Sequence, residues 1–425
     1  MTYEEARQYI EEAGRSGMMP GLVRMRALLG QLGNPQDKLQ FIHIAGTNGK
    51  GSVAAYISSI LAVSGQLVGR FVSPVVFEYE ECIQYEDLGG VHFISRDLLA
   101  QVVSETAAAV DRIKREGGEV PTVFEIETAM ALLAFVYWHC SIVVLEAGLG
   151  GREDATNVVS HVLASVITPV ALDHQMVLGG TIPEIAAAKA GIIRKNGVAV
   201  TSQRDPAALT VIREEAGQQG ASLYEVGKTE ITVRKADLEG SVFTYRGESY
   251  RTFMAGLYQA ENAALAVETC RHLPEPFTPA VEELILGIRM AAWRGRFERI
   301  CNRPLIILDG AHNPAGAEAL RSTAETLLAG RRLHGVMGVL KDKDYETMVE
   351  ILVPIFEDVA VITPPGERGL DKEVLAGVWR RKGCRKVSLA DTVMAGLKKA
   401  MDACGHEDAI LIFGSLSFFK DLDWK

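Results

Sequence analysis

Near its beginning the chain reads Phe41-Ile-His-Ile-Ala-Gly-Thr-Asn-Gly-Lys-Gly-Ser-Val-Ala-Ala-Tyr56. The apolar run from Phe41 to Ala45 predicts a buried strand, and the apolar positions from Val53 onward predict a helix. In the glycine-rich turn between them, backbone N–H groups and the helix N-terminus can form a nest for phosphate oxygens. Lys50 would add positive charge for the outer phosphates. The stretch therefore predicts a phosphate-binding loop of Gly46, Thr47, Asn48, Gly49, Lys50, Gly51 and Ser52.

This loop is a shortened variant of the general P-loop pattern, which places a first glycine five residues before the glycine of the Gly-Lys pair. Ile44 occupies that position here. The alternative interpretation is an ordinary tight turn between a strand and a helix. Gly-Lys-Gly-Ser at such a junction is uncommon, so the motif and its context together favour nucleotide binding.

Composition and charge exclude several classes of protein. The 425 residues allow two or three domains, and 48% hydrophobic with 23% charged residues is typical of a protein with an ample core. The net charge of -10 argues against broad attraction to nucleic acid or to an anionic membrane. The six cysteines are scattered without a CxxC pair, which favours a reducing cytosol. The most apolar helix candidate, Ala129–Trp138, is too short to span a bilayer, so we expect a cytoplasmic protein.

Polar residues follow three further predicted strands at the point where each strand ends. These residues are Ser73, Glu146 and His174. Ligands of open α/β sheets bind at the edge formed by the C-terminal ends of the strands. A hard cation bound there needs one or two carboxylates in addition to water and phosphate. Taken alone, Ser73 would be a turn residue, Glu146 a turn or helix N-terminal acid, and His174 a loop or core histidine. Their joint placement favours a metal site.

Lys189 lies late in a short alanine-rich helix that Gly191 can terminate. A lysine at that position is ordinarily a solvated charge that interacts favourably with the helix dipole. The apolar residues close to Lys189 in the sequence allow it a role other than that of a solvated charge.

The remaining pattern predicts two α/β units. The acidic segment Tyr79–Val91 is interpreted as a surface excursion, and residues 222–256 alternate like a small antiparallel sheet on the first unit. A boundary is expected within Trp293–Arg303. Short strands and helices alternate after it, and the first of these strands ends in the polar run Asp309–Pro314. We predict a mostly parallel, P-loop-type domain with a small antiparallel sheet over residues 1–298, and a Rossmann-like α/β domain over residues 299–425.

These stretches, in this order, resemble the folylpolyglutamate synthase/dihydrofolate synthase branch of the Mur ligase superfamily. The resemblance runs from about Leu22 to the C-terminus. It rests on the family motifs AGTNGKGS, ExGxGGRxDATN, LDH, AxKAGII, HQxxN, GRFE and DGAHNP, which match Ala45–Ser52, Glu146–Asn157, Leu172–His174, Ala187–Ile193, Gln259–Asn262, Gly295–Glu298 and Asp309–Pro314. Gly338–Asp344 and Gly414–Leu416 also fit the family's C-terminal domain.

The resemblance implies an ATP-dependent ligase that forms an amide between a carboxylate and glutamate, through an acyl phosphate. By likeness, the loop from Gly46 to Ser52 holds the ATP phosphates, and Ser73, Glu146 and His174 are the magnesium ligands. Lys189 matches a lysine that family members carry in the N-carboxylated form. The nucleotide is further contacted by Asn262, Arg296 and Asp309.

By the same resemblance, two segments border the pterin-side substrate. They consist of Thr122, Val123, Phe124 and Glu125, and of Glu153, Asp154 and Ala155. Lys50, Lys189, His174 and His312 are the expected catalytic residues. A monovalent cation is a further candidate cofactor beside ATP and Mg²⁺. The expected partners are ATP, L-glutamate and a pterin or folate, with no nucleic acid and no membrane, and the expected state is a monomer.

The sequence departs from the family pattern in two places on the acceptor side. Val75–Ile83 lacks the histidine and arginine that usually follow the Ser-Pro pair, and Glu153 stands where leucine is usual. Trp293-Arg-Gly also replaces the usual Trp-Pro-Gly. The leading interpretation is glutamate ligation to dihydropteroate or a folyl glutamate, and these changes are the ground for an alternative, a Mur-type ligase for another carboxylate or amine. A third alternative, a non-catalytic nucleotide-binding protein, would need the loop without the metal-type residues and the Asp309–Pro314 motif.

Overall fold

The computed structural model describes residues 1–14 and 19–422. Its first sheet has eight strands in the order β4-β3-β2-β5-β1-β6-β7-β8. The strands are β1 Phe41–Ala45, β2 Val68–Phe71, β3 Ile83–Asp87, β4 Gly90–Phe93, β5 Ile142–Glu146, β6 Val162–Ile167, β7 Val198–Thr201 and β8 Ser222–Glu225. All neighbours pair in parallel except the β2–β3 and β3–β4 pairs. The central strand β1 aligns Ile44 with Glu146 of β5 and Ala45 with Ile167 of β6, so these strands end at one edge.

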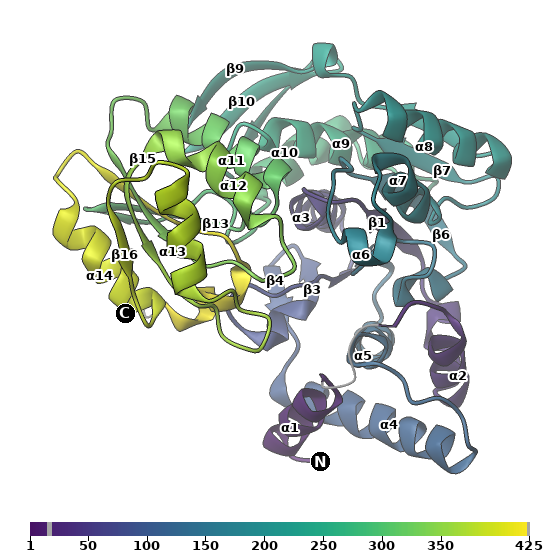
Figure 1. Cartoon of the computed structure of the whole chain (residues 1–425). Helices are drawn as coiled ribbons and strands as arrows, with labels where there is room; N and C mark the ends of the chain where they lie inside the picture. The colour runs from purple at the N-terminus through teal and green to yellow at the C-terminus, as the bar shows by residue number, and fades with distance from the viewer. Residues whose placement is uncertain (15–18, 423–425) are drawn as a thin grey trace.

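Helices cover both faces of this sheet (Figure 1). On one face α3 (Lys50–Val63) packs against α9 (Gln259–Arg271) and α10 (Val281–Met290). The opposite face is covered by α1 Tyr3–Ala13, α2 Val23–Gln31, α4 Arg96–Arg115 and α5 Val123–Tyr137. Near β6–β8 lie α6 Gln175–Leu178, α7 Ile182–Ala190 and α8 Pro206–Gln219.

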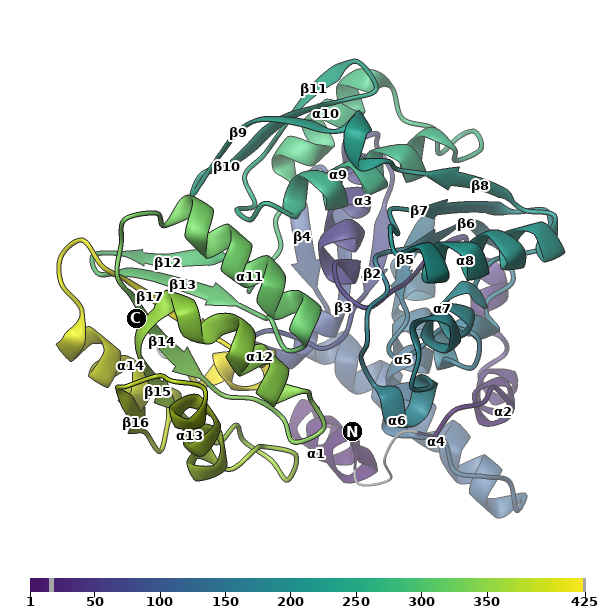
Figure 2. The same ribbon diagram turned by 45° about the horizontal axis from the view of Figure 1, so that its top comes forward.

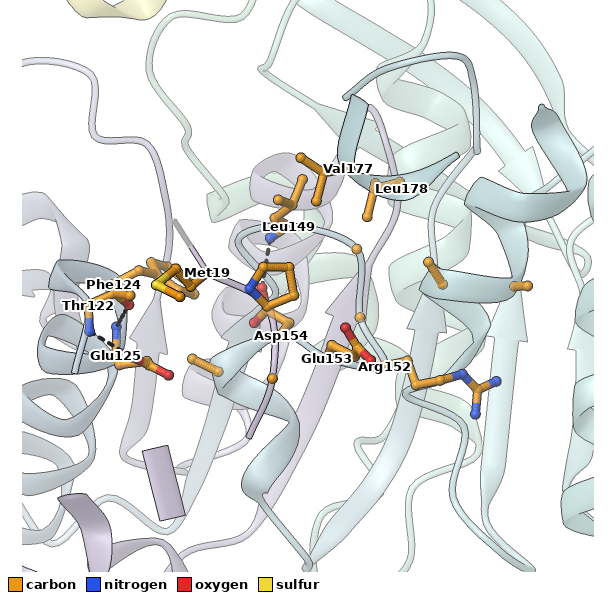
Figure 3. Close-up of a pocket in the computed structure, with 17 residues that line it drawn as sticks. Met19, Thr122, Phe124, Glu125, Leu149, Arg152, Glu153, Asp154, Val177 and Leu178 are labelled. Carbon is orange, nitrogen blue, oxygen red and sulfur yellow. Dashed lines mark hydrogen bonds between the residues drawn. The ribbon is translucent and has the colours of Figure 1, made fainter. Parts of the chain in front are cut away.

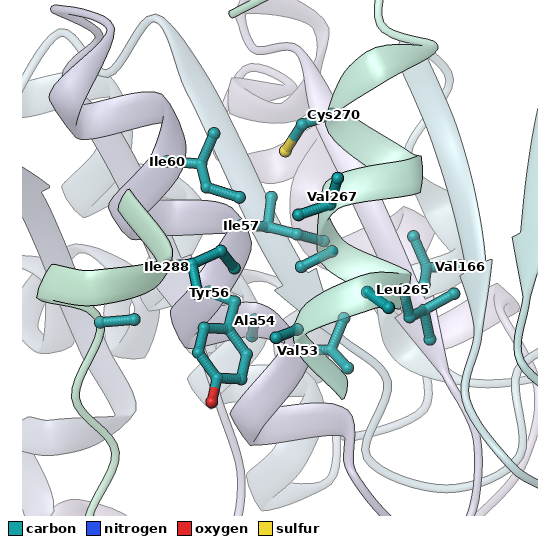
Figure 4. Packing of buried hydrophobic residues seen from close by; sticks show 14 of the residues in the cluster. Val53, Ala54, Tyr56, Ile57, Ile60, Val166, Leu265, Val267, Cys270 and Ile288 are labelled. Atoms are coloured by element: carbon teal, nitrogen blue, oxygen red, sulfur yellow. The ribbon is translucent and has the colours of Figure 1, made fainter. Parts of the chain in front are cut away.

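The helix α3 is buried almost throughout its length, from Gly51 to Ala62. Its apolar residues interdigitate with those of α9 and with Val166 of β6, as Figure 4 shows. Contact with α10 is close because Gly287 has no side chain; a Cβ there would lie 2.7 Å from the backbone nitrogen of Ile60. Tight packing on both sides fixes the N-terminus of α3 relative to the sheet edge.

A three-stranded antiparallel sheet lies beside α9 and α10, in the order β11-β10-β9. Its strands are β9 Thr232–Asp237, β10 Gly240–Tyr245 and β11 Glu248–Thr252. Figure 1 and Figure 2 both show it at the top of the molecule. The prediction of a small antiparallel sheet is confirmed for these strands.

The second domain has a six-stranded sheet in the order β12-β13-β17-β14-β15-β16, parallel except for β12. Its strands are β12 Glu298–Asn302, β13 Leu305–Asp309, β14 Leu333–Met337, β15 Phe356–Val361, β16 Val387–Leu389 and β17 Ala409–Phe413. One face carries α11 Pro314–Leu327, α12 Tyr345–Leu352 and α13 Lys372–Arg381, and the other carries α14 Val393–Ala403. The predicted division after residue 298 falls at the beginning of β12 and stays a prediction.

Two sequence-based expectations about local structure are wrong. Tyr79–Val91 is not a surface excursion, because β3 and β4 extend the first sheet. Its acid Glu86 lies 3.3 Å from the guanidinium of the buried Arg70 in β2, and Gln84 accepts a hydrogen bond from the same group. Ser222–Glu225 pairs in parallel with β7, so it belongs to the first sheet and not to the antiparallel one.

None of the helices in the described ranges has the length and apolar character that crossing a bilayer requires.

Candidate active site

The glycine-rich loop runs from the end of β1 to the first residue of α3, as predicted. Gly46 has φ 152°, and a Cβ at this position would overlap Thr168 Oγ1. Gly49 has φ 91° at the N-cap of α3, where a Cβ would lie 2.7 Å from Asn262 Oδ1. No side chain caps this helix terminus among the described residues. Its first N–H groups are therefore available to an anion, which is the property of a phosphate-binding nest.

Lys50 and Glu146 form an ion pair directly beside this loop. Lys50 Nζ lies 3.6 Å from Glu146 Oε1 and donates a hydrogen bond to the carbonyl of Thr47 at 3.4 Å. Glu146 ends β5 and is only 4% exposed. Burial raises the pKa of its carboxyl group, and the Lys50 ammonium partly opposes this rise. The pair places one positive and one negative group at the sheet edge where a phosphate and its counter-ion would lie.

Lys189 of α7 lies on the other side of the loop. Its side chain is 4% exposed, and its ammonium donates a hydrogen bond to the Gly46 carbonyl at 2.7 Å. Burial, with the nearby charge of Lys50, lowers the pKa of Lys189 to about 7. The interpretation of Lys189 as a solvated helix-end charge is therefore wrong, since the side chain is buried and bonded to the loop.

His174 follows β6 and adopts a left-handed backbone conformation with φ 50°. Burial, followed by the charge of Lys343, lowers its pKa to about 4, so its imidazole is neutral at neutral pH. Neutral imidazole is the form that binds metals. Ser73 lies at the same sheet edge just beyond β2, although among the described residues no hydrogen bond or ion pair joins it to Glu146 or His174.

The donor set of these residues fits a divalent cation. Glu146 provides a buried carboxylate whose only ion pair in the described part of the chain is with Lys50, Ser73 provides a hydroxyl, and His174 a neutral imidazole. One carboxylate with few other protein ligands is typical of Mg²⁺ sites, where water and phosphate complete the coordination.

The second domain meets the loop through the segment that follows β13. Asp309 Oδ2 accepts hydrogen bonds from the Tyr258 hydroxyl at 3.0 Å and from the backbone N–H of Phe297 at 2.9 Å. Arg296 Nη1 donates to the Gly295 carbonyl at 3.1 Å. Arg296 and Asp309 therefore lie at the junction of the two domains, and Asn262 lies against Gly49 of the loop. Contact of these three residues with a nucleotide stays a prediction.

Sequence reasoning missed a cluster that crosses the domain boundary. Asn313 and Asn48 exchange hydrogen bonds between their side-chain amides, each at 3.1 Å. Asn313 Nδ2 also donates to Asp173 Oδ2 at 3.1 Å, and Lys343 Nζ donates to Asp173 Oδ1 at 2.7 Å. His312 Nε2 lies 3.6 Å from the same carboxylate. Asp173 and Asn313 stand inside recognisable motifs, but their partners lie more than a hundred residues away and no local pattern reveals them.

A pocket of about 280 Å³ opens beside the loop, and Figure 3 shows its lining residues. Phe124, Leu149, Val177 and Leu178 form much of its apolar wall. Glu125 Oε2 accepts hydrogen bonds from the Thr122 N–H and from Arg24, whereas its Oε1 is buried and has no partner among the described residues. Six of the seven predicted substrate-side residues line the pocket, Val123 being the exception: Thr122, Phe124, Glu125, Glu153, Asp154 and Ala155.

The residues that depart from the family pattern do not all lie at the pocket. Glu153 is exposed and lines the pocket. Val75 and Cys82 do not line it, because both pack into the hydrophobic core beneath β2 and β3, and Cys82 is 5% exposed. Val75 and Cys82 therefore form no part of this pocket's wall, whereas Glu153 does, and an altered acceptor side stays a prediction.

A second polar cluster lies at the far end of the second sheet. His334, Cys404 and Asp408 place potential ligand atoms within 4.8 Å of one another. Asp408 Oδ2, however, accepts hydrogen bonds from Arg332 at 2.8 Å and from the Gly405 N–H at 2.7 Å. Asp358 Oδ2 lies 2.8 Å from His334 Nδ1, and both aspartates raise the pKa of this histidine. The cluster is an ion-pair network that is satisfied without a metal.

Two family models cover most of the chain. The Mur ligase middle domain matches residues 44–270, and the Mur ligase glutamate ligase domain matches residues 295–416. The chain is 34% identical to the dihydrofolate synthase/folylpolyglutamate synthase of Bacillus subtilis, over 99% of this chain and 98% of that protein.

Solved structures show the same similarity. The Mycobacterium tuberculosis folylpolyglutamate synthase complexed with ADP matches with a TM-score of 0.88 and 30% identity, covering 99% of this chain and 97% of that one. The Escherichia coli FolC in complex with DHPP and ADP matches with a TM-score of 0.85 and 28% identity, covering 99% and 96%. Both sequence and fold therefore agree over the whole length, and the chain belongs to the dihydrofolate synthase/folylpolyglutamate synthase family of Mur ligases.

Proposed function

We propose that this enzyme joins L-glutamate to the carboxylate of a pterin acid, dihydropteroate or a folyl glutamate, with hydrolysis of ATP to ADP and phosphate. One observation carries the proposal: two separate segments each connect the pocket to the phosphate loop. Glu146 ends β5 and pairs with Lys50, and Asp154, on the turn that follows this strand, lines the pocket. In α7, Ala188 lines the pocket, and the next residue, Lys189, donates a hydrogen bond to the Gly46 carbonyl.

The geometry suits transfer of a phosphoryl group to an acid bound in the pocket. A carboxylate is a poor acylating agent, so its oxygen first attacks the γ-phosphorus of ATP to give an acyl phosphate and ADP. The amine of glutamate then adds to the acyl carbon, and the tetrahedral intermediate expels phosphate. The N–H groups at Gly49–Ser52 hold phosphate oxygens, and Lys50 offsets charge on the transferring group. A bound Mg²⁺ would neutralise phosphate charge beside Glu146.

The pocket lining supports a pterin as the acid's ring system. Glu125 and Asp154 line the pocket, and carboxylate oxygens are acceptors for the N–H donors that a pterin ring carries. The flat apolar wall around Phe124 and Leu149 suits a planar heterocycle. The E. coli relative was solved with DHPP and ADP bound, and a folylpolyglutamate synthase was solved as an AMPPCP–folate complex.

Phosphate release tests the proposed reaction. We expect purified enzyme with ATP and Mg²⁺ to release phosphate only when both a pterin acid and L-glutamate are present. A screen of dihydropteroate, tetrahydrofolate and several amino acids would define the acceptor and the amine. Release without either substrate would indicate a simple NTPase, release with another acid would indicate a different Mur-type ligase, and no release would indicate a binding protein.

Lys189 is expected to carry an N-carboxylate. With a pKa of about 7, a large fraction of the amine is neutral at pH 8 and can attack carbon dioxide, forming a carbamate and releasing a proton. The carbamate would convert a cation beside the phosphate loop into an anion able to hold a metal ion or its water. Because protonation removes the reactive amine, activity should fall as the pH falls through this pKa.

Carbon-13 NMR of protein incubated with labelled bicarbonate checks this prediction. We expect a carbamate resonance in the wild-type enzyme that is absent from the Lys189→Gln variant. An active wild-type enzyme without that resonance would show that the lysine works unmodified. A monomeric state, a cytoplasmic location and use of a monovalent cation also stay predictions.

A further inference from the structure

Lys343 belongs to the second domain but makes its charged contacts in the first. It lies in the loop between β14 and α12, and its side chain is only 5% exposed. Its ammonium donates to Asp173 Oδ1 at 2.7 Å and lies 3.3 Å from His174 Nε2. A lysine buried to this extent needs partners that compensate its charge, and here they come from the loop that follows β6.

The chemistry of this contact fixes the state of His174. An ammonium group has three donors and no acceptor, so His174 Nε2 must face it with a lone pair. The same lone pair is what the proposed magnesium ligand would offer to a metal ion. A lysine ammonium and a divalent cation cannot use it together, and their charges repel at such short distance.

Asp173 gathers further groups from the second domain. Asn313, which is 1% exposed, donates to its second oxygen and also pairs with Asn48 of the phosphate loop. Lys343 and Asn313 therefore hold both Asp173 oxygens from across the domain boundary. These contacts connect the second domain to the phosphate loop and to the segment that carries His174.

We propose that Lys343 is a positioning residue that holds the two domains together through Asp173 and occupies the lone pair of His174 until a divalent cation displaces it. The inference rests on the proposed role of His174 as a metal ligand. All three proposed ligands, Ser73, Glu146 and His174, lie in the first domain, so the metal site survives loss of the Lys343 contact.

Manganese binding in the absence of nucleotide tests the displacement. Free Mn²⁺ can be followed by electron paramagnetic resonance in wild type, Lys343→Met and Lys341→Met. Lys341 is the matched control, because it is exposed in the same loop and its side chain bonds only to the Glu367 carbonyl among the described residues. We expect Lys343→Met to bind Mn²⁺ on the order of tenfold more tightly, the scale seen when groups that contact metal ligands are changed. Lys341→Met should match the wild type.

Small-angle scattering tests the domain contact independently of the metal. Without ligands, Lys343→Met should have a larger radius of gyration than wild type, whereas Lys343→Arg, which keeps a cation, should resemble it. If Lys343→Met does not fold, Lys343→Gln provides the same test with a hydrogen-bonding side chain. Unchanged scattering of a folded variant would overturn the proposed contact.

The His174→Ala variant separates failure of this inference from failure of the metal assignment. It should bind Mn²⁺ more weakly than wild type. If it does so while Lys343→Met binds like wild type, the inference about Lys343 is overturned and His174 remains a ligand. If His174→Ala binds like wild type, His174 is not a ligand and both proposals are overturned.

Discussion

The Lys50→Ala variant is expected to lose a factor of 10² or more in kcat, the scale reported for removal of one group that stabilises transition-state charge. Lys50 is the first residue of α3, and its Nζ lies 3.6 Å from Glu146 Oε1, beside the phosphate-binding nest. Its charge is needed most when negative charge moves onto the leaving oxygen of ADP. The loss should therefore appear mainly in kcat and less in the KM for ATP.

Phosphate release at saturating substrates measures this effect. Lys114→Ala is a suitable control, because Lys114 is an exposed helix residue whose ion pair with Asp111 spans 3.9 Å. Thermal unfolding must accompany the assay, because the substitution leaves the buried Glu146 carboxylate without its cation. Near-normal turnover of a folded Lys50→Ala enzyme would show that this loop is not where the phosphoryl group is transferred.

The Glu146→Gln variant should separate activity from stability. We expect a loss in kcat on the order of 10²–10³, together with weakened Mn²⁺ binding, because the one buried carboxylate at the proposed metal site is gone. Stability should not fall at neutral pH. Burial raises the pKa of Glu146 in the native state above its value in the unfolded chain. As the pH rises from the unfolded-state pKa to the native-state pKa, the charged carboxylate therefore lowers the free energy of unfolding.

Activity, metal binding and melting temperature should be measured on the same preparation. The wild-type melting temperature should decline relative to that of Glu146→Gln as the pH rises, since only the wild type must keep a buried charge. Glu214→Gln, a substitution at an exposed position of α8 away from the pocket, serves as the control for loss of an acid. Full activity in a folded Glu146→Gln enzyme would remove this residue from the proposed site.

The sequence was informative where chemistry and local pattern coincide. The strand, turn and helix around Lys50 are found as predicted. Strand-end residues such as Glu146 could be identified because parallel strands must end at a common edge. Lys189 was identified by resemblance, although its burial against Gly46 could not be read from its neighbours.

The failures all concern contacts between distant segments. Acidic Tyr79–Val91 looked solvent-exposed because nothing near it shows that Arg70 provides a buried positive charge on the adjoining strand. Lys343 was identified only as part of the matched segment Gly338–Asp344, since its partner Asp173 is 170 residues away. The Val75–Ile83 segment was assigned to the acceptor-side wall by comparison with the family motif, yet Val75 and Cys82 pack inward. Periodicity carries no information on any of these pairings.

Consecutive placement of Ala188 and Lys189 limits how this enzyme can evolve. Ala188 lines the substrate pocket, and the next residue of α7, Lys189, donates a hydrogen bond to the phosphate loop. Reshaping this part of α7 to admit a different acid would disturb the catalytic end as well. Glu153, on the exposed rim of the pocket, is not tied to the phosphate loop in this way. Substitutions that change which acids the enzyme accepts should therefore accumulate there first.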